Sequence, residues 1–214
     1  MDINSKNIAA IRQDYCLSSL DEEETGDDPV LFFARWFSEA ERSNCLEVNA
    51  MTLSTVDESN RPHARIVLLK GIENGAFIFF SNYLSNKGIQ LQGNNNAALV
   101  FFWPELQRQV RIEGNIIKVS AAASDDYFYS RPMESQIGAI ASPQSKPISS
   151  RKELEQKVLL LSNNNNTVSR PEHWGGYALQ PANLEFWQGR SSRLHDRILF
   201  EKKEGGWQKC RLAP

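Results

Sequence analysis

Apolar side chains recur first at helical spacing and then at every second position along this chain. Asp28 precedes Pro29, and this pair predicts the start of a helix because Asp caps a first turn and Pro is tolerated within it. The expected core-facing side of this helix consists of Val30, Phe33, Ala34, Phe37 and Ala40. From Ala50 onward the repeat shortens to two residues, which predicts strands.

Turn-forming residues separate the predicted strands. The strands span residues 50–56, 63–70, 76–81, 97–103, 107–119, 174–179, 183–188 and 207–212, with Gln180 and Pro181 as the turn after 174–179. Further helices are expected at 83–92, 121–130 and 151–162. Hairpin-joined strands with helices at the margins predict a mainly β fold with flanking helices, closed into a small barrel. The lack of a βαβ rhythm argues against a doubly wound nucleotide-binding fold.

Length and composition predict one domain with a single core. The chain has 214 residues, of which 41% are hydrophobic, and this is enough for one such core. Residues 18–28 are strongly acidic, so we expect residues 1–28 to form a partly mobile N-terminal segment. Residues 29–214 are expected to form the single domain.

Charge and cysteine usage predict a cytoplasmic protein that binds neither nucleic acid nor membrane. The formal net charge is −2, which provides no general attraction to polyanions. No apolar run approaches the ~20 residues of a membrane-spanning helix, and the polar N-terminus lacks the apolar stretch of a signal peptide. Cys16, Cys45 and Cys210 are expected to be free thiols, and no Cys or His cluster suggests a metal.

Residues 170–197 carry the densest candidate chemistry. If residues 193–197 are extended, Arg193, His195 and Arg197 lie on one face, because alternate side chains of a strand share a side. Two guanidiniums around an imidazole suit a planar anionic ligand, since Arg binds phosphate through a rigid fork and stacks on rings. A solvated, charged edge strand explains the same pattern. The Trp residues, the paired Gly and the absence of Lys favour the ligand site.

Further cations and one amide interrupt the predicted elements. Arg65 and Lys70 bracket a β run, and Lys87 lies near a helix start, where backbone N–H groups favour phosphate. Gln109 could bond the edge of a flat heterocycle, because its amide both donates and accepts. Ordinary strand-end charges, a solvated lysine and an exposed sheet face explain these features at least as well.

Tyr127, Arg131 and Ser135 follow one another at four-residue steps. In a helix these positions share one face, which would bring a phenol, a guanidinium and a hydroxyl together as a phosphate cradle. A plain transition from helix to loop is the equally good alternative, because Pro132 interrupts the run.

Several of these stretches resemble the signature blocks of the pyridoxamine 5′-phosphate oxidase family. Residues 185–188 read Glu-Phe-Trp-Gln and, four residues later, residues 193–197 read Arg-Leu-His-Asp-Arg. Further matching blocks lie at 65–70, 130–139 and 173–176, and the resemblance extends from residues 11–15 to residues 211–214. It implies an FMN-binding split β-barrel that forms a homodimer, with FMN held between the subunits.

The resemblance also implies a reaction and a role for each matching residue. Pyridoxamine and pyridoxine 5′-phosphate would be oxidised to pyridoxal 5′-phosphate, with O2 as electron acceptor, H2O2 as by-product and NH3 released from the amine. The implied FMN ligands are Arg65, Ile66, Val67, Leu68, Leu69, Lys70, Phe80, Ser81, Asn86, Lys87, Gln109, Gln144, Ser145, Trp187 and Arg197. The implied substrate ligands are Arg12, Tyr15, Lys70, Tyr127, Arg131, Ser135, Arg193 and His195. Among the substrate ligands, Arg193 and His195 would be catalytic, while Arg12 and Tyr15 would close over the pocket as part of an N-terminal lid.

Three positions depart from the family pattern. Asn86 stands where many relatives carry a second cation, which puts one contact to the flavin phosphate in doubt; Arg190 replaces a frequent Gly, and Val48 a frequent Pro. Two other functions fit the sequence less fully. One is a flavin reductase or other split-barrel oxidoreductase with a nicotinamide donor, which has no use for a substrate-phosphate cradle. The other is a non-enzymatic binder of pyridoxal phosphate.

Overall fold

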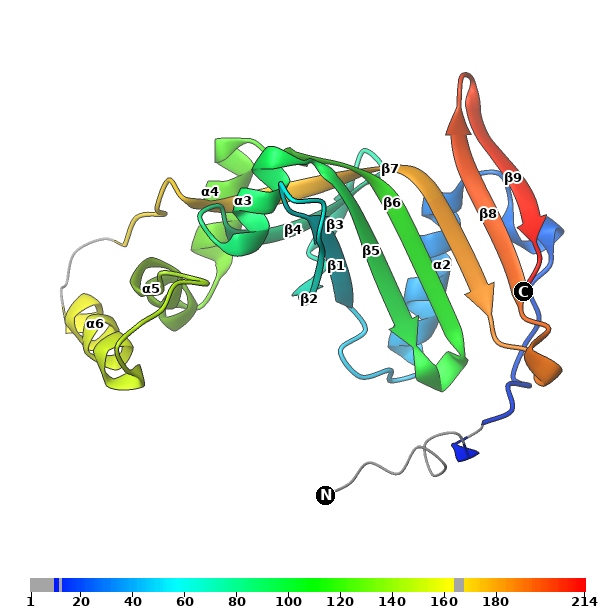
Figure 1. The fold of residues 1–214 in the computed structure, drawn as a ribbon, viewed down its shortest axis with the longest axis horizontal. Helices are drawn as coiled ribbons and strands as arrows, with labels where there is room; N and C mark the ends of the chain where they lie inside the picture. Colours follow the sequence, from blue (N-terminus) through cyan, green and yellow to red (C-terminus); the bar gives the residue numbers. More distant parts are fainter. Residues whose placement is uncertain (1–9, 12, 164–167) are drawn as a thin grey trace. The chain divides into compact units, whose positions relative to one another are not determined.

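The computed structural model of the protein describes residues 10, 11, 13–163 and 168–214. Within this part of the chain, nine strands form one sheet in the order β2-β1-β5-β6-β7-β4-β3, with β8 paired to β7 and β9 to β8 (Figure 1). The strands are β1 (Ala50–Val56), β2 (Pro62–Leu68), β3 (Gly71–Glu73), β4 (Ala76–Asn82), β5 (Asn96–Trp103), β6 (Arg108–Lys118), β7 (Trp174–Gln188), β8 (Asp196–Lys203) and β9 (Gly206–Leu212). The helices are α2 (Pro29–Arg42), α3 (Asn86–Gly93), α4 (Ala121–Ser130), α5 (Met133–Ala141) and α6 (Arg151–Asn163).

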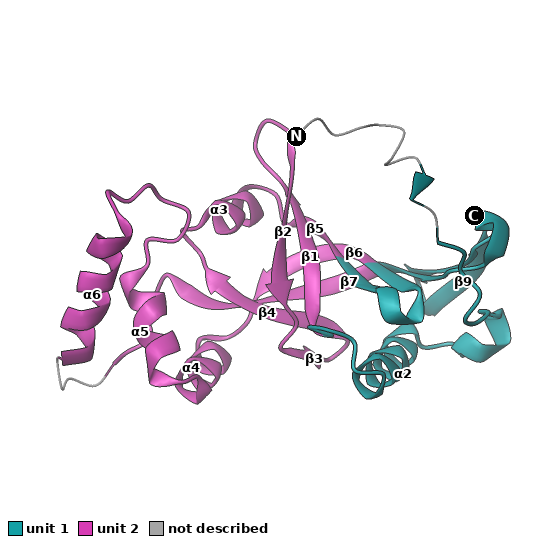
Figure 2. Ribbon diagram, turned by 90° about the horizontal axis from the view of Figure 1, so that it is seen from below, with its two compact units in different colours: residues 1–48, 100–111, 183–214 teal, residues 49–99, 112–182 magenta. Residues whose placement is uncertain are grey.

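The chain divides into two compact units (Figure 2), and β5, β6 and β7 contribute residues to both. Unit 2 comprises residues 49–99 and 112–182. In it, β1 and β2 form an antiparallel hairpin, and β4 pairs with β3 and with the first half of β7. The α5 and α6 helices lie side by side in this unit (Figures 1 and 2). Its buried side chains include Met51 and Leu53, which alternate along β1 as the two-residue repeat predicts. On β4, Phe77, Ile78 and Phe79 are buried in succession, so the alternation does not hold there.

Unit 1 comprises residues 1–48, 100–111 and 183–214. Its core is aromatic: the Phe32 ring lies 4.6 Å from Phe186, and the Phe33 ring lies 5.0 Å from Phe101. The second half of β7 pairs with β8, and β8 pairs with β9. Helix α2 therefore buries its apolar side against strand residues of the same unit.

The predicted face of α2 is only partly right. Phe33 and Ala40 are buried as expected, but Ala34 is exposed, and Phe32 and Trp36 are buried in its place. Both sets of positions satisfy the helical repeat, so the periodicity alone could not choose between them. The contact of Phe32 and Trp36 with Phe186 decides the orientation.

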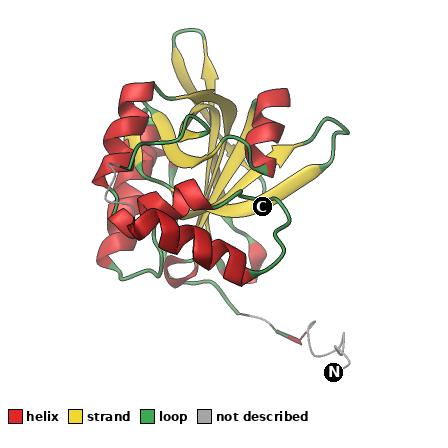
Figure 3. Ribbon diagram, turned by 90° about the vertical axis from the view of Figure 1, so that its left-hand side faces the viewer, coloured by secondary structure: helices red, strands yellow, loops and turns green. Residues whose placement is uncertain are grey.

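The turn predicted at Gln180 and Pro181 is wrong, because β7 continues through both residues. Strand β6 comes so close there that a Cβ on Gly114 would lie 2.0 Å from the Gln180 carbonyl oxygen. Glycine on β6 thus permits the close approach of β6 to β7 at Gln180 and Pro181. Strand β3, strand β8 and helix α5 were not predicted, whereas the remaining strands and helices match to within a few residues. Figure 3 distinguishes the strands from the helices by colour.

The described residues contain no helix that is long and apolar enough to cross a membrane. They also contain no group of three or more His, Cys, Asp or Glu side chains arranged to hold a metal ion. Cys16 and Cys210 are exposed and Cys45 is buried, and all three are free thiols, as expected.

Replacing the cap of α2 should destabilise unit 1 measurably. Asp28 Oδ1 accepts hydrogen bonds from the backbone N–H groups of Val30 (2.8 Å) and Leu31 (3.2 Å). We expect Asp28→Ala to lower the free energy of unfolding by ~1 kcal/mol, because two backbone donors lose their acceptor. Urea denaturation measures this, with Asp27→Ala as the control, since the Asp27 side chain is fully exposed. Equal effects of the two substitutions would contradict the capping role.

Candidate active site

A cavity of about 540 Å³ lies in unit 1 and another of about 530 Å³ in unit 2. We call the first the His195 pocket and the second the Arg131 pocket. The Arg131 pocket is lined by Ile66, Val67, Leu68, Lys70, Phe80, Ser81, Lys87, Tyr127, Arg131, Pro132, Ser135, Gln144 and Trp174. The His195 pocket is lined by Ile11, Gln13, Asp14, Tyr15, Arg190, Ser192, Arg193 and His195.

Three stacked aromatic rings form one wall of the Arg131 pocket. The Phe80 and Tyr127 ring centroids lie 3.9 Å apart with 19° between the planes, and Trp174 stacks on Phe80 at 5.6 Å. Gly176 on β7 makes room for this stack, since a Cβ there would lie 2.8 Å from the Phe80 ring. The Arg131 guanidinium carbon lies 4.7 Å from the Trp174 ring centroid, so the Trp174 ring stabilises the cation through a cation–π contact.

The Arg131 guanidinium is the least satisfied polar group of this pocket. Its Nη1 atom is buried without a hydrogen-bond partner among the described residues. Burial lowers the pKa of Arg131, and burial together with the nearby Arg65 charge lowers the pKa of Lys87. None of the described residues that line the pocket is acidic. A buried donor without an acceptor is costly, so the site is built to receive an anion.

Residues 127, 131 and 135 do converge, but not along one helix. Tyr127 lies in α4, Arg131 caps the C-terminus of α4, and Ser135 lies in the first turn of α5. Pro132 separates the two helices and serves as the N-cap of α5, a place where its missing N–H costs nothing. The break in the helix therefore brings the three side chains to one cavity instead of separating them.

Lys87 and Gln144 extend the polar side of the Arg131 pocket. Lys87 Nζ donates to Gln144 Oε1 at 3.0 Å, and Ser81 Oγ donates to the same oxygen at 3.3 Å. Arg65 does not line the cavity, because its guanidinium donates to Thr55 Oγ1 at 2.6 Å and to Gln90 Oε1 at 2.9 Å. These bonds fix Arg65 within the range at which it influences Lys87.

Three further expected FMN ligands of unit 2 lie outside the lining of the Arg131 pocket. Leu69 is buried in the core, and Asn86 lines a separate cavity beside Ile89 and Gln90. Ser145 is exposed, with a backbone φ of 70° in a tight turn. Of residues 65–70, four therefore line the Arg131 pocket: Ile66, Val67, Leu68 and Lys70. Arg65 and Leu69 do not.

His195 is held in one orientation by its surroundings in unit 1. The Arg190 backbone N–H donates to His195 Nδ1 at 3.1 Å, and the Trp187 ring lies 4.6 Å away. Because Nδ1 accepts this bond, the neutral ring carries its proton on Nε2. Burial and the Arg193 charge lower the pKa of His195, while Asp196 acts in the opposite direction. The neutral form of the imidazole is therefore favoured more strongly than in an ordinary histidine.

The predicted common strand face of Arg193, His195 and Arg197 is wrong. Residues 191–193 form a 3₁₀ turn (η3, Ser191–Arg193), in which Ser192 and Arg193 have φ angles of 58° and 62°, and β8 begins only at Asp196. This turn places Arg193 and His195 in one pocket, whereas Arg197 Nε pairs with Glu185 at 2.8 Å. The alternation of side chains along a strand does not apply here, because residues 191–195 are not part of a strand.

The N-terminal segment reaches the His195 pocket through Tyr15. Its ring lies 5.9 Å from His195 and 5.8 Å from Trp187, in an edge-on contact. A Cβ on Gly189 would lie 2.8 Å from Tyr15, so this approach requires glycine. Arg12, the other residue expected to close over the pocket, lies outside the described residues.

Two family models match the chain. Residues 37–163 match a model described as pyridoxamine 5′-phosphate oxidase, and residues 174–214 match the C-terminal dimerisation region of pyridoxine 5′-phosphate oxidase. The chain belongs to the pyridoxamine 5′-phosphate oxidase family. The enzyme class expected from the sequence, an oxidoreductase of this family, is confirmed.

Relatives of this oxidase family align over nearly the whole chain. A pyridoxine/pyridoxamine 5′-phosphate oxidase of Leptospira interrogans is 59% identical over 97% of this chain and 98% of its own. The solved structure of PhzG from Burkholderia lata, in complex with tetrahydrophenazine-1-carboxylic acid, has a TM-score of 0.87 at 26% identity and covers 92% of this chain and 99% of that one. A pyridoxamine 5′-phosphate oxidase-related, FMN-binding protein of Nostoc punctiforme shares the fold, with a TM-score of 0.72 at 17% identity over 87% and 98% of the two chains. The expected mainly β split-barrel fold is confirmed.

In this oxidase the predicted residues fall into two sets. Lys70, Tyr127, Arg131 and Ser135 line the Arg131 pocket, whereas Tyr15, Arg193 and His195 line the His195 pocket. Trp187 contacts His195, and Gln109 and Arg197 lie on β6 and β8 of unit 1. Within one chain, Lys70 and His195 thus line different cavities.

Sequence reasoning missed several residues that line the two pockets. Trp174 belongs to a block that matches the family, yet only its stacking on Phe80 shows that it forms a wall. Asp14 falls within the matching block 11–15 and Arg190 is a departure from the family pattern, and the sequence assigned neither a role. Arg190 orients His195 through its backbone N–H, a contact that carries no side-chain signal in the sequence.

His195 should titrate below the ordinary histidine value. Since its pKa is lowered from 6.5, the folded state loses stability as pH falls from 6.5 toward the folded-state value, and nothing is lost above 6.5. NMR titration of the ring, assigned with a His195→Gln variant, measures this pKa. Arg193→Met should move it upward, because one opposing charge is removed. A pKa at or above 6.5 in the unaltered protein would contradict this reading.

Proposed function

We propose that this protein oxidises pyridoxamine 5′-phosphate and pyridoxine 5′-phosphate to pyridoxal 5′-phosphate. O2 is the electron acceptor, H2O2 is formed, and the amine substrate yields NH3. The observation that carries the proposal is the buried, unpartnered Nη1 of Arg131 in a cavity walled by stacked aromatic rings. A phosphate ester of a flat ring provides what this cavity lacks, an anion and an aromatic face.

FMN is the cofactor, and the residues present fit it. Lys87, Gln144 and Ser81 offer a cation and amide and hydroxyl groups on one side of the Arg131 pocket. Ile66, Val67 and Leu68 line the same pocket with apolar side chains and strand backbone, which suits a flat flavin ring. Arg65, Lys87 and Ser145 would hold the phosphate region, and Gln109, Trp187 and Arg197 the remainder. When bound, FMN accepts a hydride from the substrate and passes the electrons to O2.

The substrate phosphate is assigned to Lys70, Tyr127, Arg131 and Ser135. Two cations and two hydroxyls supply enough donors for its oxygens, and Arg131 contributes a geometry that Lys does not. Fixing the phosphate also fixes the distance of the pyridine ring from the anchor. That restriction positions C4′ for reaction. Positioning of this kind can lower the activation barrier by a large amount.

Arg193 and His195 are assigned to the reacting end of the substrate. The neutral imidazole presents its Nε2 proton, because Nδ1 is occupied by the Arg190 N–H. It can therefore donate to a substrate oxygen without first gaining a proton. Arg193 adds a fixed positive charge that holds the ring and stabilises negative charge developing on it.

The functional form is a homodimer in which each site uses residues of both copies. Each pocket holds only part of the ligand set, and each lies within one unit of the chain. Residues 187–197, which carry Arg193 and His195, fall inside the region matched by the dimerisation model. We therefore assign the His195 pocket of one copy and the Arg131 pocket of the other to one FMN.

The N-terminal segment, residues 1–28, is proposed to act as a lid on the single domain formed by residues 29–214. The contacts of Tyr15 with Trp187 and His195 support this role. The cytoplasm is the proposed location, because free thiols such as the exposed Cys16 and Cys210 persist in a reducing compartment.

The proposal is tested by oxygen consumption. Purified, FMN-loaded protein should consume O2 and release H2O2 and pyridoxal 5′-phosphate when either substrate is added. Pyridoxamine without its phosphate should react far more slowly, since the Arg131 pocket would then lack its anion. Oxidation of a nicotinamide donor in place of these substrates would favour a flavin reductase, and binding of pyridoxal phosphate without turnover would favour a carrier.

A further inference from the structure

We propose that Asp14 makes this oxidase prefer the amine substrate over the alcohol. The inference rests on the proposed function, because it concerns the C4′ group of the same two substrates. That group is an ammonium in pyridoxamine 5′-phosphate and a hydroxyl in pyridoxine 5′-phosphate. A carboxylate at that end of the pocket distinguishes them by charge.

Asp14 lies in the cavity that holds the residues of the reacting end. It lines the His195 pocket together with Arg193 and His195. Among the described residues lining that pocket it is the one acidic residue, and Arg190 and Arg193 line the same pocket. Arg190 Nη1 already pairs with Asp196 at 3.1 Å, so the Arg193 charge is the one that Asp14 has to offset. Without Asp14, that charge would disfavour a cationic substrate.

Contacts on both sides of Asp14 fix its place. Ser191 Oγ donates to Asp14 Oδ2 at 3.0 Å and also lies 3.2 Å from the Tyr15 backbone oxygen. The next residue, Tyr15, is held against Trp187 and against Gly189. The hydrogen bond from Ser191 thus holds Asp14 to the loop that carries Arg193. An exposed carboxylate without such a bond would have no fixed position relative to the pocket.

The expected size of the effect follows from the exposure of Asp14. A primary ammonium stays charged at pH 7, because amines of this type have a pKa near that of Lys, about 10.4. An ion pair at an exposed position is weakened by water, so its loss should change affinity by roughly threefold to tenfold. The change should appear in KM with kcat unchanged, if the carboxylate stabilises the positive charge on nitrogen equally in the bound substrate and in the transition state.

The experiment compares both substrates in Asp14→Asn, which keeps the shape of the side chain and an acceptor for Ser191. We expect kcat/KM for pyridoxamine 5′-phosphate to fall roughly threefold to tenfold through KM, while the value for pyridoxine 5′-phosphate stays within about twofold. Raising the salt concentration should reduce the amine preference of the unaltered enzyme but not that of the variant. Asp21→Asn is the matched control, because Asp21 pairs with Arg211 and does not line the pocket.

The outcomes separate this inference from the function on which it rests. If the unaltered enzyme oxidises both substrates but Asp14→Asn changes neither the ratio of their kcat/KM values nor its salt dependence, the inference is wrong and the proposed function stands. Equal losses for both substrates would also overturn it, since they indicate a disturbed lid. If the unaltered protein oxidises neither substrate, the proposed function fails first.

Discussion

Arg193→Ala and His195→Ala should each lower kcat/KM for both phosphorylated substrates by roughly 10²- to 10⁴-fold, the range found when a positioned proton-handling or charge-stabilising group is removed. The structure explains why the loss should be large for His195. The Arg190 N–H and Trp187 fix the orientation of its ring. No other histidine is among the described residues that line the pocket, so no second imidazole can replace it. Steady-state oxygen consumption measures the change.

FMN binding is the control for these two variants. Neither residue is among the proposed FMN ligands, so the flavin absorbance per protein should be unchanged. Arg193→Lys should recover part of the activity, because it restores the charge without the guanidinium fork. Full activity in both alanine variants would show that the His195 pocket has no part in catalysis.

Arg131→Ala should raise KM for pyridoxamine 5′-phosphate by roughly two orders of magnitude, the cost expected for removing one partner of a buried, hydrogen-bonded charge pair. Its buried Nη1 has no partner among the described residues, so we expect its main interaction to be with the ligand. The low rate with unphosphorylated pyridoxamine should be nearly unaffected. Kinetics with both compounds therefore separate loss of phosphate binding from general damage.

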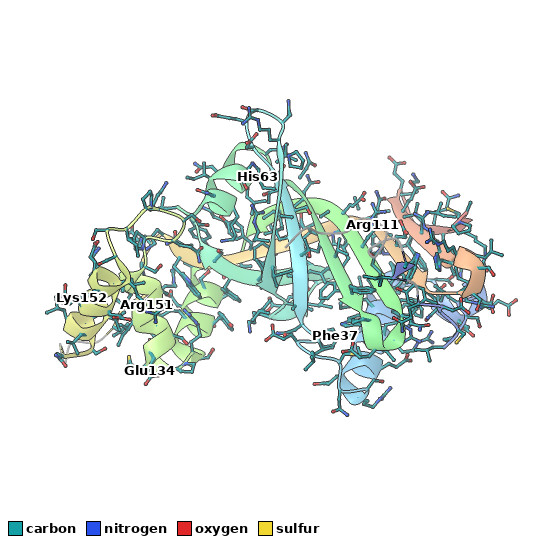
Figure 4. All side chains as sticks on the ribbon, turned by 60° about the horizontal axis from the view of Figure 1, so that its bottom comes forward. Phe37, His63, Arg111, Glu134, Arg151 and Lys152 are labelled. Carbon is teal, nitrogen blue, oxygen red and sulfur yellow. The ribbon has the colours of Figure 1, made fainter. Side chains whose placement is uncertain are left out.

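Two variants complete this test. Arg131→Lys should fall between the alanine variant and the unaltered enzyme, because Lys binds phosphate as a point charge. Arg151→Ala should change nothing, since Arg151 lies at the start of α6 with its side chain 90% exposed and paired to Glu155 (Figure 4). An equal loss of activity with pyridoxamine and with its phosphate in Arg131→Ala would contradict the assignment.

Local patterns predicted much of the fold, and their failures have physical causes. The two-residue repeat located β1 and β5 closely, because each of these strands buries alternate side chains. It failed at residues 180–181, where a glycine on β6 lets the strand continue past a proline. It also failed at residues 193–197, where left-handed backbone at Ser192 and Arg193 replaces an extended segment. Such compensations depend on partners that are distant in sequence.

The site was predictable in its chemistry but not in its assembly. The four-residue steps from Tyr127 to Ser135 indicated a phosphate cradle, yet the three residues meet because two helices end and begin at Pro132. Spacing could not show that Asn86 and Leu69 lie outside the cavity, since that depends on which way each side chain points. Nor could it show that Arg193 and Lys70 line different pockets of one chain.

The central claim is that each active site combines the Arg131 pocket of one copy with the His195 pocket of the other. Mixing the inactive variants Arg131→Ala and Arg193→Ala tests it most directly, after unfolding and refolding so that the subunits exchange. In a mixed dimer one of the two sites would then contain both intact residues. Since half of the dimers are mixed, we predict recovery of roughly a quarter of the unaltered activity. No recovery, with mixed dimers demonstrated by a tag on one subunit, would contradict the shared site.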